Sequence, residues 1–198
     1  MMIELTSTPI ILMVILGVAG MIIPVINVLR RERGSSTFYG AIAFGALLLA
    51  LGFVIFQFYD DNLAPAAVFS EDVLADDGFG SFFAIAMLIV SIMTVAGSFN
   101  YMRKRSNPAI YFSLILLSSI GMVLIAFATD LVMLFVAWEL MSIPTYILAG
   151  FNKKNPSSNE AAIKYFLFGA LSSGIIIYGI SLAYGITGST NIGDVIYG

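Results

Sequence analysis

The sequence of 198 residues contains no cysteine and no histidine. Iron–sulfur clusters need cysteine thiolates, and structural zinc sites and histidine-ligated haem need cysteine or histidine. Such centres, and disulfides, are therefore excluded within this chain. If the protein takes part in a redox process, the electrons must travel through another polypeptide.

Charge is also scarce. Only 11% of the residues are charged, 60% are hydrophobic, and the mean hydropathy is +0.99. A soluble domain carries about 25% charged residues, so this composition indicates a polytopic membrane protein. The first apolar run, Ile10–Leu29, is too long for a signal-peptide core and is followed by "RRERGSS" instead of a small-residue cleavage site. We interpret it as a retained span.

Six apolar runs are each long enough to cross a hydrocarbon layer of about 30 Å as a helix. They lie near residues 8–29, 38–59, 79–102, 109–128, 131–151 and 160–187. The predicted fold class is therefore all-α, a polytopic bundle of six transmembrane helices.

The charged residues of the connecting loops separate by sign. The basic residues lie in the three loops that follow the first, third and fifth runs: Arg30, Arg31, Arg33, Arg103, Lys104, Arg105, Lys153 and Lys154. Most carboxylates lie in the other loops and near the ends of the chain: Glu4, Asp60, Asp61, Glu71, Asp72, Asp76, Asp77, Asp130 and Asp194. Because basic loops stay in the cytoplasm, this pattern predicts a multi-pass protein of the inner (plasma) membrane with both termini outside.

One acidic residue lies within the fifth run, where no loop explains it. Placing a carboxylate such as Glu139 near the centre of a membrane helix costs about 2.5–3.5 kcal/mol on insertion scales. Ser142 and Tyr146 follow at i+3 and i+7 and share its helix face, which should point to the bundle interior or to a hydrated cavity. Pro144 cannot bond to the carbonyl of Leu140, which predicts a bend and a free carbonyl beside the carboxyl group.

Lys164 is the one basic residue that the loops do not account for. A carboxyl group in apolar surroundings whose charge depends on a nearby cation can take up and release a proton. Glu139 and Lys164 are therefore the candidate residues for proton translocation, with Ser142, Pro144 and Tyr146 in support. Two plainer interpretations remain open, namely a lysine that reaches the headgroups and a static ion pair in a structural scaffold.

Other polar or small residues predict structural roles. Asp77, in "DDGFGSFF", is a candidate helix N-cap, and Asp130 lies in a turn that water can reach. The small residues Gly169 and Ser173 predict close helix packing.

Two longer stretches resemble a known family. "FVAWELMSIPTYILAGF" followed by "NEAAIKYFLFGALSSGIIIYGISLAYGITGS" is similar to the antiporter-like membrane subunits of respiratory complex I, with "DDGFGSFF" as a further shared feature. The similarity is greatest to subunit N of NADH:quinone oxidoreductase and of its deazaflavin-dependent archaeal relatives. It covers mainly residues 77–190.

The resemblance implies a function. The chain would be a proton-translocating membrane subunit, not itself a redox catalyst, in which Glu139 and Lys164 form part of an intramembrane axis. Quinone, flavin and iron–sulfur clusters would lie in partner subunits, and none in this chain. Other membrane subunits, protons and the lipid bilayer would be its partners, and nucleic acid would not.

The resemblance also implies a division of the chain. Residues 1–108 would form an N-terminal three-helix segment, and 109–198 would begin an antiporter-like repeat that normally continues. We therefore expect either a fragment of the family's usual length or completion by a second polypeptide. The alternative function, a subunit of a multi-subunit cation/proton antiporter, uses the same Glu and Lys pattern.

Overall fold

The computed structural model describes residues 7–30, 35–61, 73–103 and 105–197, with the side chains of Asp60 and Asp61 left out. Within these ranges the chain is all-α. The helices are α1 (Thr8–Leu29), α2 (Ser36–Asp61), α3 (Gly78–Met102), α4 (Pro108–Phe127), α5 (Leu131–Ala149), α6 (Pro156–Thr187) and α7 (Ile192–Tyr197).

The first six helices correspond to the six predicted spans, and each is long and apolar enough to cross a membrane. The largest difference in bounds is at α6, which begins four residues earlier than expected. Pro156 occupies its first turn, and the side chain of Asn155 accepts a hydrogen bond from the Ser157 N–H at 3.1 Å, so this polar stretch still caps a helix. The short α7 is not predicted from hydropathy.

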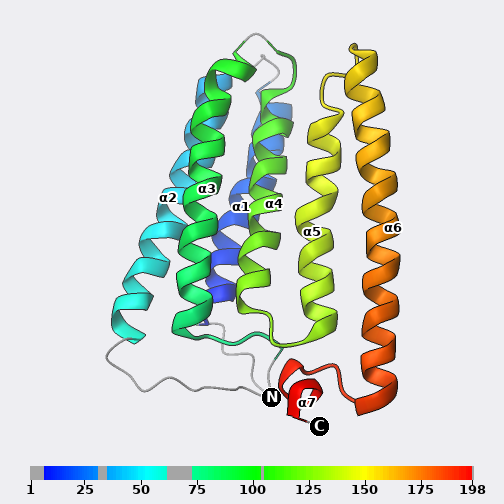
Figure 1. Cartoon of the computed structure of the whole chain (residues 1–198). Helices are drawn as coiled ribbons and strands as arrows, with labels where there is room; N and C mark the ends of the chain where they lie inside the picture. Colours follow the sequence, from blue (N-terminus) through cyan, green and yellow to red (C-terminus); the bar gives the residue numbers. More distant parts are fainter. Residues whose placement is uncertain (1–6, 31–34, 62–72, 104, 198) are drawn as a thin grey trace.

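Successive long helices run in opposite directions (Figure 1). The C-terminal ends of α1, α3 and α5 therefore lie at one end of the bundle, and those of α2, α4 and α6 lie at the other end together with Ser7 and α7. The predicted separation of charge is found in the described residues, with Arg30, Arg105 and Lys153 at the first end and Asp76 and Asp130 at the second. Arg31, Arg33, Lys104, Glu4, Glu71 and Asp72 lie outside the described residues.

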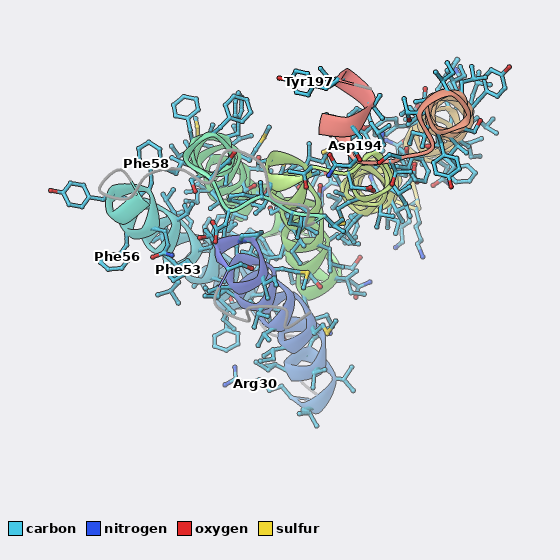
Figure 2. The ribbon with its side chains drawn as sticks, turned by 90° about the horizontal axis from the view of Figure 1, so that it is seen from below. Arg30, Phe53, Phe56, Phe58, Asp194 and Tyr197 are labelled. Carbon is cyan, nitrogen blue, oxygen red and sulfur yellow. The ribbon has the colours of Figure 1, made fainter. Side chains whose placement is uncertain are left out.

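Helix α4 is the centre of the packing. It contacts α1, α2, α3 and α5, and most of its residues are buried, including Phe112, Leu116 and Phe127. Helix α5 packs on α4, and α6 packs on α5, so that α6 lies at the edge of the helix bundle (Figure 2). No residue of α6 is fully buried.

The hydrophobic core includes residues from both sides of the predicted boundary between residues 108 and 109. Leu12 and Leu16 of α1 and Leu88 of α3 belong to the same core as Phe112 of α4 and Ala137 of α5. The division into two segments therefore stays a prediction that rests on the resemblance.

A proline and a serine from two helices meet in this core. Pro24 lies inside α1 and has no N–H to bond to the carbonyl of Gly20, one turn earlier. The hydroxyl of Ser113 on α4 donates to that carbonyl. Because an unpaired backbone carbonyl is costly in an apolar interior, this bond offsets the effect of the proline and ties α1 to α4.

The acidic end of the bundle is held together by short backbone pairings among three segments, 73–75, 127–131 and 190–192, which we call the clasp. The Thr129 N–H donates to the Val73 carbonyl at 3.1 Å, and the Ile192 N–H donates to the Thr129 carbonyl at 2.9 Å. Residues 127–131 thus form the middle segment of the clasp. The clasp connects the start of α7 to the part of the molecule formed by α1, α2, α3 and α4.

Aspartates at this end cap helices. Asp77 accepts from the Gly80 N–H at 2.7 Å, which confirms the predicted N-cap of α3. Asp130 accepts from the N–H groups of Val132 and Met133 at the start of α5. A carboxylate at a helix N-terminus satisfies free N–H groups and interacts favourably with the helix dipole, so both residues have clear structural roles.

Candidate functional site

Glu139 lies near the middle of α5, whose position is set by its close packing on α4. At Gly121 of α4, an added Cβ would lie 2.3 Å from the Met141 nitrogen and 2.7 Å from the Ala137 oxygen. Only glycine permits the two backbones to approach so closely. Ala137 and Met141 flank Glu139 in sequence, so this contact fixes the part of α5 that bears the carboxyl group.

Pro144 lies inside α5 and is buried, and the bend expected next to Glu139 stays a prediction. The hydroxyl of Ser118 on α4 donates to the carbonyl of Met141 at 3.0 Å, adjacent to the Leu140 carbonyl that the proline leaves without its helical donor. Thr145 Oγ1 donates to the Ser142 carbonyl at 2.7 Å. Two hydroxyl donors therefore bond to backbone carbonyls of the α5 turn that contains Pro144.

Glu139 and Tyr146, which their spacing places on one face of α5, both contact α6. The hydroxyl of Ser173 on α6 donates to Glu139 Oε1. Tyr146 lies against Gly169, where an added Cβ would come within 2.1 Å of the phenolic oxygen. Both Glu139 and Ser173 are half-buried.

The third residue of the predicted polar stripe, Ser142, is only 6% exposed. It is thus enclosed more completely than Glu139, although it lies one helical turn away. The face that carries Glu139 is therefore directed to protein, consistent with the expectation that a carboxyl group avoids the lipid.

Lys164 is placed differently from the expectation of a close pair with Glu139. Its Nζ forms an ion pair with Glu160 Oε1 at 2.5 Å within α6, and the two side chains are 64% and 65% exposed. This is the ion pair found among the described residues, and it does not involve Glu139. The pair lies on the outer surface of α6, not in the interface with α5.

Helix geometry explains this placement. Ser173 lies nine positions after Lys164, which corresponds to about 13.5 Å along the helix axis and to opposite faces of the helix. Since Ser173 faces Glu139, Lys164 faces away from α5. A direct contact between Lys164 and Glu139 is therefore absent from this arrangement of α5 and α6.

Ser173 is the residue at this site that sequence reasoning did not identify as functional. Together with Gly169 it predicts packing, and the structure adds a hydrogen bond to the intramembrane carboxyl group. The available signal was the spacing of small or polar residues on α6. The half-buried residues Ala162, Gly169, Ser173, Ile176 and Ile180 are separated by seven, four, three and four positions, which places them on one helix face.

Comparison with known proteins identifies relatives. Residues 128–197 match the family described as "NADH:quinone oxidoreductase/Mrp antiporter, TM". The chain is 38% identical over 185 residues to NADH-quinone oxidoreductase subunit N of Trichlorobacter lovleyi, covering 92% of this chain and 36% of that protein. It is 38% identical over 125 residues to F(420)H(2) dehydrogenase subunit N of Methanosarcina mazei, covering 63% of this chain and 25% of that protein.

Comparison of the fold with solved structures also identifies a relative in a respiratory complex. A chain of respiratory complex I from Thermus thermophilus superimposes with a TM-score of 0.74 and 28% identity, over 92% of this chain and 38% of that chain. The chain thus spans little more than a third of the length of the subunit N from Trichlorobacter lovleyi and of the chain from Thermus thermophilus. These relatives are membrane subunits of multi-subunit respiratory complexes. By sequence and by fold, the chain is a multi-pass membrane protein that is similar to subunit N of complex I, as its motifs indicate.

Proposed function

We propose that the chain is part of a proton-translocating membrane subunit of a complex I-type oxidoreductase, with Glu139 as a residue that takes up and releases the proton. The observation that carries the proposal is the placement of Glu139. A carboxyl group within a membrane-spanning helix faces a second helix, is half-buried, and is hydrogen-bonded by Ser173. Ionisable groups so placed in membranes mark ion pathways and proton relays.

Lys164 is also part of the proposed proton pathway, although it does not contact Glu139. In the arrangement of α5 and α6 its charge is balanced by Glu160, not by Glu139. We therefore propose that Lys164 contributes to the pathway from the outer face of α6. Ser142, Pro144 and Tyr146 support Glu139 by shaping the partly enclosed part of α5 around it.

The proposed setting follows from the relatives and from the charge pattern. The subunit would lie in the inner (plasma) membrane with the Arg and Lys loops in the cytoplasm and both ends of the chain outside. Its partners would be other membrane subunits of the complex. Iron–sulfur clusters would lie in partner subunits, because this chain has no cysteine or histidine with which to hold clusters or haem. Quinone and flavin chemistry would also take place in partner subunits, as the family resemblance implies.

The second candidate is a subunit of a multi-subunit cation/proton antiporter. One observation favours it, since the matched family includes Mrp antiporters by its description. The subunit N relatives favour the oxidoreductase. Purification of the native complex distinguishes the two, because iron–sulfur and quinone-reactive subunits accompany only an oxidoreductase, and sodium-dependent proton exchange without them identifies an antiporter.

The test of the proposed function is Glu139→Gln in the native membrane complex. The substitution keeps the size and polarity of the side chain and removes its ability to ionise. We expect the complex to assemble and proton pumping in membrane vesicles, measured with a pH-sensitive dye, to be lost or sharply reduced. Asp194→Asn, the corresponding change at an exposed carboxylate of α7, should leave pumping unchanged. Normal pumping by an assembled Glu139→Gln complex would contradict the proposal.

A further inference from the structure

The partner of the Glu139 carboxyl group is a single residue of the neighbouring helix. Among the described residues, the hydrogen bond from Ser173 is the one found to that carboxyl group. No ion pair in the described part of the chain involves it. The hydrogen bonding of the Glu139 carboxyl group therefore depends on where α6 places Ser173.

Close contacts between α5 and α6 fix the position of Ser173 relative to Glu139. One turn before Ser173, Gly169 leaves room for the phenol of Tyr146, which a side chain at this position would displace. Near the other end, a Cβ at Gly150 would lie 2.7 Å from Ala162 Cβ. Small residues at these points bring the two helices close enough for a short side chain to span the gap.

Aromatic contacts and a hydrogen bond hold the two helices in register. The ring of Tyr146 packs against Tyr165 at a centroid distance of 4.8 Å, with the planes at 83°. Ser158 Oγ, near the start of α6, donates to the Ala149 carbonyl at the end of α5 at 2.8 Å. These contacts restrict sliding of α6 along α5, so Ser173 stays opposite Glu139.

A hydroxyl group suits a carboxyl group that changes its protonation state. The serine hydroxyl has one donor and two acceptor positions and can rotate. It donates to the ionised carboxylate, and it can accept from the protonated acid. Alanine can do neither, whereas threonine can do both.

We propose that Ser173 is a positioning residue that holds the Glu139 carboxyl group in the interface between α5 and α6 in both of its protonation states. This inference rests on the proposed function of Glu139 and extends it to α6. It assigns to the Gly169 and Ser173 pair a role beyond packing. Gly169 sets the approach of the helices, and Ser173 uses that approach to reach the acid.

The test uses Ser173→Ala, Ser173→Thr and a matched control, Ser172→Ala, in the native complex. Ser172 is exposed, and its hydroxyl donates to the Phe168 carbonyl of its own helix at 2.9 Å. Two quantities are measured, namely the pumping rate and the infrared carbonyl stretch of the protonated Glu139 side chain, assigned by its loss in Glu139→Gln. The stretch reports hydrogen bonding to this carboxyl group, which a purely structural role of Ser173 would not affect.

We expect Ser173→Ala to lower pumping about tenfold, because hydrogen bonds to charged groups are among the stronger ones, and to move the carbonyl band to higher frequency. Ser173→Thr should restore both quantities, and Ser172→Ala should change neither. An unmoved band, or full pumping, in Ser173→Ala would overturn the inference while leaving the role of Glu139 intact. If alanine prevents assembly, Ser173→Cys, a weak donor of similar size, undergoes the same two measurements. Normal pumping in Glu139→Gln would instead show that the proposed function itself is wrong.

Discussion

At the scale of single residues, the two candidates for proton translocation have different surroundings. Glu139 lies half-buried against α6 and is hydrogen-bonded by Ser173, whereas Lys164 is largely exposed and bound to Glu160 one turn away. An exposed i,i+4 ion pair contributes only about 0.3–0.5 kcal/mol to stability, because water screens the charges. The ion pair therefore contributes little to stability. A large loss of proton pumping on replacement of Lys164 would have to come from a role other than this ion pair.

The ion pair between Lys164 and Glu160 can be tested by removing each charge in turn. Glu160→Gln should leave assembly unchanged and alter the free energy of unfolding by less than about 1 kcal/mol. Lys164→Met removes the charge itself and should lower proton pumping if the lysine belongs to the pathway. The two variants are compared by assembly and by pumping in vesicles. Equal, normal pumping in both would show that Lys164 serves only as an anchor at the membrane surface.

At the scale of helices, α4 and α5 pack closely enough to require glycine. The added Cβ at Gly121 would meet backbone atoms of α5, which cannot move aside as a flexible side chain can. By contrast, Gly97 of α3 is exposed and has no neighbouring atom within 4 Å of an added Cβ. The same substitution should therefore have opposite effects at these two positions.

We expect Gly121→Ala to destabilise the protein by about 3 kcal/mol through overpacking and to lower pumping, because the displaced segment carries Glu139. Gly97→Ala should be neutral or stabilising by up to about 1 kcal/mol, since alanine is the better helix former. Unfolding of the purified complex in detergent measures both. A stable, fully active Gly121→Ala variant would show that α5 is not fixed by this contact.

The clasp is a second feature at this scale. Residues 127–131 pair with 73–75 on one side and with 190–192 on the other, while Asp130 also accepts a hydrogen bond from the hydroxyl of Thr190. The start of α5 and the end of the chain after α6 are thus attached to the same short segment. This attachment limits how far the edge helix α6 can move relative to α5 at the acidic end.

At the scale of the whole molecule, the six long helices form a core of four with α5 and α6 added in a row (Figures 1 and 2). Burial decreases along this row, from the largely buried α4 to α6, which has no fully buried residue. Glu139 lies between the last two helices of the row, where enclosure by this chain is partial.

The orientation in the membrane is open to a direct test, because the natural chain has no cysteine. Single cysteines can be placed at Ser106, an exposed residue of the basic end, and at Asp194, an exposed residue of the acidic end. By the positive-inside rule, a membrane-impermeant maleimide should label Ser106→Cys from the cytoplasmic side and Asp194→Cys from outside. The reverse labelling pattern would show that both chain ends lie in the cytoplasm.

Much of the fold could be predicted from the sequence because membrane spans depend on local composition. Hydropathy alone placed the six long helices, and the sign of the loop charges separated the two ends of the bundle. The N-cap at Asp77 also depends only on neighbouring residues. The short α7 was not predicted, because its position depends on the clasp and not on its own apolarity.

The candidate site was predictable only in part. The sequence by itself determined that an acid lies within the fifth span, and the spacing of Glu139 and Tyr146 placed both on one face. Only the tertiary structure decided which helix covers that face. Residues 139 and 173 are 34 positions apart, so their contact depends on glycine-mediated approach of α5 and α6, and the 180° separation of Lys164 from Ser173 on α6 directs the lysine away from the acid.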